Sequence, residues 1–317
     1  MNIRDPSNEK VLITGASGFL GQYIFAVWER AGAEVFSISR GADKTLPTLI
    51  QCDLSSYVPN LDEGGFATVI HCAGKAHSVP RAAEEENEFF RVNVDGTRNL
   101  LKAIDATGTL PERFIFISSA SVYGVDEGID IDERSRLNAT VAYGNSKIEA
   151  EKLVSEWATT RNVAYFNFRL PLVAGFDPPG NLGKMLVAIK RGRYVAVRGN
   201  NARKSIVLAE DIAEFTLRVS GPSGSYNLTD GCDPTFCEIE QAIADGCSKK
   251  IVIKIPRPML QIGARIGDKL RLPLNTAFLR KLSSTLTFSS ELARRSLNWR
   301  PRPAIDFIRS GGLERRR

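Results

Sequence analysis

A tyrosine and a lysine four residues apart, Tyr143 and Lys147, open a stretch with helical periodicity that continues through Trp157. Residues at this spacing lie on one face of an α-helix, so the ammonium of Lys147 can approach the phenol of Tyr143. A nearby cation favours the phenolate and lowers the pKa of a tyrosine, which is otherwise about 10. We therefore expect Tyr143 to act as an acid or base toward a hydroxyl or carbonyl, although exposed helices also carry this pair without any chemical role.

A glycine-rich turn near the start of the chain predicts a nucleotide-binding element. The apolar run 10–14 ends at Gly15, glycines follow at Gly18 and Gly21, and an amphipathic segment continues to Arg30. A buried strand, a glycine turn and a helix in this order are typical of dinucleotide binding. Gly15 would make the tight turn, Gly18 would let the backbone approach a pyrophosphate, and Gly21 would let helix and strand pack closely. The phosphates would lie on the helix N-terminus.

The ends of the next two predicted strands bear on the choice of cofactor. The strand 34–39 ends in Ser39 and Arg40, where an NAD-binding fold usually has an acidic residue for the ribose hydroxyls. Serine and arginine suit a 2′-phosphate, so NADP is favoured over NAD, although Arg40 could also be a solvated strand end. The strand 48–52 leads into Asp53, from which a carboxylate can reach an adenine amine or simply form a turn.

Three further segments complete a pattern of alternating strands and helices. A buried strand is expected at 67–74, a long helix at 84–107 and another strand at 113–117, which leads into the serine-rich segment 118–124. Hydroxyl groups that follow the carboxyl end of a central strand stand where an open α/β sheet places its chemistry. We expect His71, inside an apolar run, to be a core or supporting residue. The fold class predicted is α/β, a Rossmann-type doubly wound parallel sheet.

Composition limits the remaining possibilities. The 317 residues are 43% hydrophobic and 25% charged, as in a globular protein, and they contain no apolar run long enough for a membrane span. The five cysteines and two histidines, His71 and His77, lack the spacing of a metal site, so no metal is expected. The net charge of +6 is accompanied by no nucleic-acid-binding motif, and a polyanionic small molecule accounts for it equally well. A cytoplasmic location is expected.

Five motifs together resemble the extended short-chain dehydrogenase/reductase family, over about residues 8–305. The glycine turn, Asp53-Leu54, Asn93-Val94-x-Gly96-Thr97, the segment 118–124 and Tyr143-x-x-x-Lys147 occur in the family's order and spacing. The resemblance implies that Ser119 orients the substrate oxygen, Tyr143 transfers the proton, and Lys147 holds the nicotinamide ribose and lowers the pKa of Tyr143. One departure is Gly74, where relatives often have alanine. The predicted cofactor-binding residues are Gly15, Ser17, Gly18, Phe19, Leu20, Gly21, Ser39, Arg40, Asp53, Leu54, Ala73, Asn93, Tyr143 and Lys147.

The later part of the chain resembles family members that act on nucleotide sugars. Residues 8–170 are expected to form the dinucleotide-binding domain, with later segments returning to it, and 171–310 mainly a smaller substrate-binding lobe. The resemblance implies that Asn181 and a basic residue, here Lys204 or Arg203, bind the diphosphate. Both basic residues could instead form a solvated edge. The predicted substrate-binding residues are Ser119, Ser121, Tyr123, Asn181, Arg203 and Lys204, with Tyr123 expected to line the pocket.

The reaction predicted is hydride transfer at a ring carbon, C4, of a nucleoside-diphosphate sugar. Ala120 and Ser121 replace the Asp-Glu pair of the family's 4,6-dehydratases, so dehydration is disfavoured. A 4-ketosugar reductase using NADPH is favoured over a UDP-sugar 4-epimerase that retains NAD. A reductase for a steroid- or flavonoid-like carbonyl and a nonenzymatic NADP-binding protein remain alternatives. A homodimer is expected from the resemblance, through the helices 84–107 and 141–160.

Overall fold

The molecule is built on a seven-stranded sheet in the order β11-β7-β5-β4-β1-β2-β3, in which every neighbouring pair is parallel. The computed structural model describes residues 6–41, 46, 48–62, 64–76, 83–270 and 276–314. His77 therefore lies outside the described residues. The strands are β1 Lys10–Thr14, β2 Glu34–Ser39, β3 Leu49–Gln51, β4 Thr68–His71, β5 Arg113–Ser119, β7 Ala164–Leu170 and β11 Gly224–Asn227.

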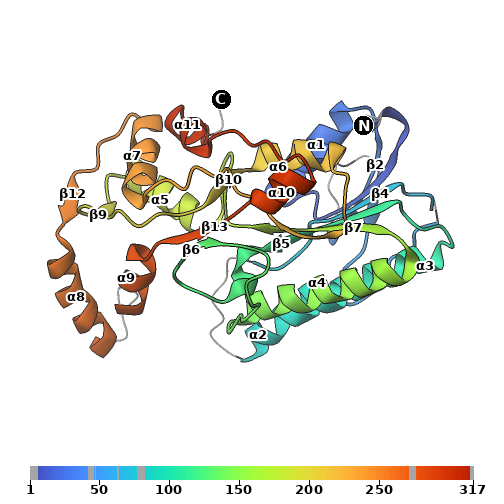
Figure 1. The fold of residues 1–317 in the computed structure, drawn as a ribbon, viewed down its shortest axis with the longest axis horizontal. Coiled ribbons are helices and arrows are strands. Elements are labelled where there is room, and N and C mark those ends of the chain that lie inside the picture. Colours follow the sequence, from blue (N-terminus) through green and yellow to red (C-terminus); the bar gives the residue numbers. More distant parts are fainter. Residues whose placement is uncertain are drawn as a thin grey trace.

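The sheet is covered by helices on both faces, which confirms the predicted Rossmann-type architecture (Figure 1). Helices α1 (Phe19–Arg30) and α6 (Ala209–Arg218) share one core with the sheet, centred on Trp28 and Phe215. Helices α3 (Gly96–Ala106) and α4 (Ala142–Arg161) share a second core on the other face. The central strands are apolar along most of their length because both of their faces are buried.

The segment predicted as one long helix, 84–107, is interrupted. Helix α2 (Ala83–Phe90) passes into a π-helical turn, η2 (Arg91–Asp95), before α3 begins at Gly96. Single π-helical turns within α-helices frequently lie at functional sites because the extra residue redirects a side chain. Here the turn carries Asn93, whose buried side chain contacts the site described below.

The second half of the chain alternates between the sheet and a smaller lobe. Strand β11 and helix α6 return to the main sheet, whereas α5 and α7 share an apolar core of their own with β8, β10 and α11. Two two-stranded parallel pairs, β10-β8 and β12-β9, connect parts of this half, and a third, β13-β6, joins it to the first half. The bounds are β6 Gly128–Ile131, β8 Leu172–Ala174, α5 Gly180–Lys190, β9 Val195–Val197, β10 Ile206–Leu208, α7 Phe236–Gly246, β12 Ile253–Ile255, β13 Leu286–Phe288, α10 Glu291–Ser296 and α11 Ala304–Arg309.

Helices α8 (Arg257–Leu270) and α9 (Thr276–Ser283) lie at the end of the molecule far from α3. In Figure 1 α8 projects past the rest of the lobe, at the lower left of the view. Its inner side packs through Leu260 and Ala264 against Val197 and Leu279. Among the described residues, none of the helices is long and apolar enough to cross a membrane.

Candidate active site

Ser119 and Tyr143 meet at the carboxyl end of β5. Ser119 ends the strand, and Tyr143 is the second residue of α4, which packs along the same face of the sheet. Their side chains share a hydrogen bond, and the Ser119 Oγ also accepts the backbone N–H of Ser121 at 3.2 Å. Both residues are half-buried. Two hydroxyl groups are thus held together at the sheet edge where the sequence predicted the chemistry.

The electrostatics of Tyr143 differ from the expectation drawn from its spacing to Lys147. Burial raises the pKa of Tyr143 above its ordinary value, the hydrogen bond from Ser119 opposes this, and Lys147 is not among the causes. The physical reason is that the ammonium of Lys147 donates to the Ile117 carbonyl at 2.8 Å and lies over the Phe116 ring. The phenol is therefore neutral at neutral pH and able to donate a proton.

Lys147 is buried behind Tyr143 on the same helix. Burial lowers the pKa of Lys147 to about 8, and the nearby Cys72 and Glu151 oppose this shift. A β-carbon on Gly74 would lie 3.3 Å from the Lys147 Nζ, so the backbone after β4 passes directly beside the ammonium. The lysine thus links the end of β4, the end of β5 and helix α4.

Asn93, carried by the π-helical turn, holds the segment after β4 in place. Its Oδ1 accepts the backbone N–H of Lys75 at 2.7 Å, and its Nδ2 donates to the Ser146 Oγ at 2.8 Å. The Ser146 hydroxyl in turn donates to the Tyr143 carbonyl. Asn93 was predicted as a cofactor-binding residue, and the structure shows it bridging two of the elements that frame the site.

His71 supports the site from below, in line with the prediction of a core or supporting residue. Its Nδ1 is 2.6 Å from the Thr14 hydroxyl, and its Nε2 is 2.9 Å from the Thr97 hydroxyl. Thr97 donates to the Asn93 carbonyl, so it accepts from Nε2–H, and Thr14, which accepts the Ala73 N–H, donates to Nδ1. Burial, with a smaller effect of Lys147, lowers the pKa of His71 to about 3, so the ring is neutral.

The glycine turn after β1 has the features that a dinucleotide pyrophosphate requires. Gly15 has a φ of 71°, and a β-carbon on Gly21 would lie 2.0 Å from the Gly15 carbonyl oxygen. Helix α1 follows directly, and no side chain caps its N-terminus at Gly18. Backbone N–H groups of a first helical turn without a side-chain cap bind phosphate oxygens well. Ser17 and Gly18 are exposed, Phe19 is half-buried and Leu20 is buried at this turn, so the residues fit the cofactor.

The predicted ribose and adenine contacts lie along the same edge of the sheet. Arg40 is exposed immediately after β2, next to the half-buried Ser39. Asp53 accepts the backbone N–H and the hydroxyl of Ser55, so at least one carboxylate oxygen has a local role in a turn. Leu54 is buried, and its carbonyl accepts from Asn99 at 2.8 Å. The cofactor roles of these four residues stay predictions.

Ser121 and Tyr123, the two substrate-binding candidates that follow Ser119, differ in their hydrogen bonding. The Ser121 Oγ is buried and has no hydrogen-bond partner among the described residues. Tyr123 is only 1% exposed, and its hydroxyl donates to Asn227 and accepts from Arg169. Its ring also stacks on Phe288. Tyr123 therefore lies in the core between the two parts of the chain, which differs from the expected place lining a pocket.

Arg203 and Lys204 are used to join segments of the smaller lobe. The Lys204 ammonium donates to the carbonyls of Lys281 and Ser284, and Arg203 donates to the Asp233 carbonyl. Burial lowers the pKa of Lys204. Next to them is a hollow of about 270 Å³. Its lining residues are Val197, Arg198, Gly199, Asn200, Asn201, Ala202, Arg257, Ser283 and Thr285.

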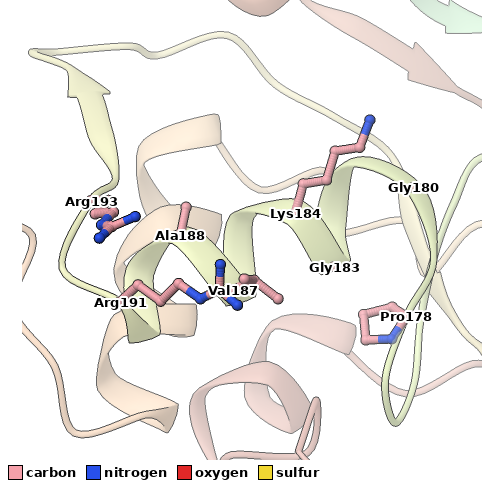
Figure 2. Close-up of a pocket in the computed structure, with 8 residues that line it drawn as sticks. All are labelled: Pro178, Gly180, Gly183, Lys184, Val187, Ala188, Arg191 and Arg193. Carbon is pink, nitrogen blue, oxygen red and sulfur yellow. The ribbon is translucent and has the colours of Figure 1, made fainter.

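Asn181 stands apart from those two residues, exposed in the first turn of α5. A hollow of about 490 Å³ runs along this helix, between Pro178 and Arg193, and Figure 2 shows the side chains that line it. Neither Asn181 nor any of Ser119, Tyr143 and Lys147 lines this hollow. The structure thus brings the three catalytic candidates together, but Asn181 shares no hydrogen bond with them or with Arg203 among the described residues.

A buried ionic network behind the site was not predicted from the sequence. Glu151, one turn after Lys147 on α4, accepts from Arg169 at the end of β7 at 2.7 Å and from the Ser118 hydroxyl. Glu151 and Arg169 are each about 5% exposed. The sequence gave only a weak signal, because Arg169 lies inside an apolar run but Glu151 has charged neighbours. Together they fix α4 to the strands that carry Ser119.

Comparison with known proteins places the chain in a family. Residues 11–227 match the model of the NAD dependent epimerase/dehydratase family. A similar relative is the N-acetyl-alpha-D-glucosaminyl-diphospho-ditrans,octacis-undecaprenol 4-epimerase of Escherichia coli O157:H7, 27% identical over 82% of this chain and 80% of the relative. Another is the GDP-6-deoxy-D-mannose reductase of Pseudomonas aeruginosa, 26% identical over 75% of this chain and 80% of the relative.

Solved structures share the fold over almost the whole chain. The UDP-N-acetylglucosamine 4-epimerase from Bacillus cereus has a TM-score of 0.75 at 18% identity, covering 95% of this chain and 98% of its own. RMD from Pseudomonas aeruginosa, solved in complex with NADPH, has a TM-score of 0.69 at 20% identity, covering 96% and 98%. This chain belongs to the NAD dependent epimerase/dehydratase family, and it is an NAD(P)-dependent enzyme.

Proposed function

We propose that this enzyme is an NADPH-dependent reductase of a 4-ketosugar carried on a nucleoside diphosphate. The observation that carries the proposal is the hydrogen-bonded pair of Ser119 and Tyr143, with a phenol that burial keeps protonated. A protonated phenol next to a second hydroxyl is suited to donating to a ketone oxygen as negative charge develops there. An enzyme that removes a proton from an alcohol would instead need a tyrosine with a lowered pKa.

The role proposed for each residue follows from the geometry. When bound, the nicotinamide cofactor supplies the hydride to C4. Ser119 and Tyr143 hold the ketone oxygen, and Tyr143 gives it the proton, so the carbonyl becomes an alcohol. Lys147, whose buried ammonium lies beside the Gly74 backbone after β4, would hold the nicotinamide ribose.

The preference for NADPH rests on the end of β2. Arg40 is exposed directly after the strand, at the position where an acidic residue is usual for NAD, so a 2′-phosphate would meet a cation there. GDP-6-deoxy-D-mannose reductase, among the relatives, is a reductase by name. A 4-epimerase with retained NAD is the alternative, and the UDP-glucose 4-epimerases among the relatives support it.

The carrier of the sugar is proposed from the smaller lobe. Arg198 and Arg257 line the hollow beside Arg203 and Lys204, so two cationic side chains face it and could bind a diphosphate. A polyprenyl diphosphate is a second candidate carrier, because the Escherichia coli relative acts on an undecaprenol-linked sugar by name. Initial rates with nucleotide-linked and polyprenol-linked forms of the same 4-ketosugar would distinguish the two.

The proposed mechanism is tested by Tyr143→Phe, which removes the hydroxyl and keeps the ring. We expect the rate of NADPH oxidation with a UDP-linked 4-ketosugar to fall roughly 100- to 10,000-fold, the usual contribution of a positioned proton donor. Tyr57→Phe is the matched control, since Tyr57 is an exposed tyrosine outside the site. Equal rates for wild type and Tyr143→Phe would refute the assignment.

A further inference from the structure

A long basic segment connects α7 to the projecting helix α8. From Gly246 to Gly267 the sequence contains five lysines or arginines and no aspartate or glutamate. The five are Lys249, Lys250, Lys254, Arg257 and Arg265, and all are exposed. The segment therefore carries a net charge of +5, and the exposed Asp268 follows it in the last turn of α8.

Large aliphatic side chains are exposed among these cations. Val252 is 81% exposed, Met259 63% and Ile262 61%, and Ile253 in strand β12 is also exposed. Apart from Ile129 and Tyr57, no other large apolar side chain in the described part of the chain exceeds 60% exposure. Leaving this much aliphatic surface in water is unfavourable, and a cluster of it usually marks a surface that binds something.

The geometry of α8 separates its inner side from a second apolar side. Leu260 and Ala264 are four residues apart and buried against the lobe, so they define the inner side. Met259 and Ile262 are three residues apart, so they also share a side, and at about 100° per residue it lies nearly opposite the inner one. In Figure 1 α8 projects from the end of the lobe, and both Met259 and Ile262 are exposed. The outer apolar side is therefore accessible.

The charge pattern determines which partner fits this surface. A second copy of the same surface would bring five cations against five, which disfavours self-association. Nucleic acid is also anionic, but its recognition commonly uses aromatic side chains for stacking, and Gly246 to Gly267 has none. Exposed aliphatic residues interleaved with lysine and arginine are the pattern of helices that lie in the interface of an anionic bilayer.

We propose that β12 and α8, with the preceding lysines, form a docking surface for an anionic phospholipid membrane. Met259 and Ile262 would enter the acyl boundary, and the five cations would lie at the headgroups. The hollow beside Arg203 shares Arg257 with this surface, so docking would place that edge of the lobe near the bilayer. The proposal concerns binding alone and does not depend on the reaction proposed above.

The test is flotation of the full chain with large vesicles of phosphatidylcholine containing about 30% phosphatidylglycerol, against vesicles of phosphatidylcholine alone. We expect binding only to the anionic vesicles, and weaker binding as salt is raised, because the cations act through screened attraction. Met259→Gln/Ile262→Gln should lower the partition coefficient by at least about tenfold. Lys249→Gln/Lys250→Gln should lower it by a comparable factor, since each cation contributes about fivefold.

Leu110→Gln/Leu292→Gln is the matched control, because it removes two exposed leucines elsewhere on the surface. It should bind like wild type, and thermal melting of every variant shows that each is folded. Wild type that does not float with anionic vesicles, or a Met259→Gln/Ile262→Gln variant that floats equally well, would overturn the proposal. So would a wild-type dimer, seen in sedimentation, that this double substitution dissociates, since the occupant would then be a second copy.

Discussion

At the scale of residues, the protonation state of each titratable group in the site depends on how deeply the group is buried. Tyr143 and Lys147 are both shifted toward their neutral forms, and burial is the largest cause in each case. The phenol is the acid, whereas the ammonium supplies positive potential only while it keeps its proton. Both groups therefore act in their protonated forms, and Lys147, which has the lower pKa, sets the upper pH limit for reduction.

We predict that kcat/KM for reduction falls above about pH 8. The pKa of Lys147 is lowered to about 8, so the lysine is charged below that pH and loses its proton above it. Loss of the charge removes the cation that would hold the nicotinamide ribose, and the rate should fall up to about tenfold per pH unit. The measurement is the pH profile of the NADPH-dependent reaction at subsaturating ketosugar.

Lys147→Met is the control for this profile. It should be slow at neutral pH and should lack the alkaline decline, because no titrating cation is left at the proposed cofactor site. A wild-type profile that stays level up to about pH 9.5 would contradict the role of Lys147.

That Ser119 and Tyr143 lie together could be predicted from the sequence, but the electrostatics of the site could not. Spacing on a helix places Lys147 near Tyr143. It does not reveal that the ammonium donates to the Ile117 carbonyl, or that Tyr123 is buried against Asn227. Both facts depend on contacts between segments that lie far apart in the sequence.

At the scale of elements, helix α4 is held to the sheet by one buried ion pair. Glu151 accepts two hydrogen bonds or more from Arg169 and one from Ser118, and all three side chains are buried. A buried pair of this kind contributes little net stability compared with apolar residues, but breaking it leaves an unpaired charge in the core.

We predict that Glu151→Met lowers the free energy of unfolding by about 3–5 kcal/mol, because the Arg169 guanidinium is left buried without its carboxylate. The double variant Glu151→Met/Arg169→Met should recover most of the loss. Urea unfolding of wild type, both single variants and the double variant measures this coupling. A double variant that is less stable than either single variant would contradict it.

Most of the strands and the first helix could be predicted from periodicity and turn residues. Strands β1 and β2 occupy the expected ranges 10–14 and 34–39, and α1 the range 19–30. The interruption of the helix 84–107 could not be predicted, because apolar periodicity hardly changes across η2. The turn coincides with contacts of Asn93 to Lys75 and Ser146, which are set by the tertiary structure.

At the scale of the whole molecule, parallel strands place three functions along one edge of the sheet. The glycine turn follows β1, Arg40 follows β2, and Ser119 ends β5, while the segment between β9 and β10 and the start of α8 contribute the cationic edge of the smaller lobe. The pairing of β13 with β6 and of β12 with β9 joins segments more than 50 residues apart. Sequence patterns predicted the main sheet, but the shape of the smaller lobe depends on those distant pairings.

The central claim is that hydride passes from NADPH to C4 of a diphosphate-linked sugar and remains in the product. The direct measurement supplies NADPH carrying deuterium at the transferred position, with a UDP-linked 4-ketosugar, and follows the product by NMR. We predict one deuterium at C4 for each NADPH oxidised. Interconversion of two sugars at C4 with no net oxidation of NADPH and no deuterium in the product would contradict the claim and identify an epimerase.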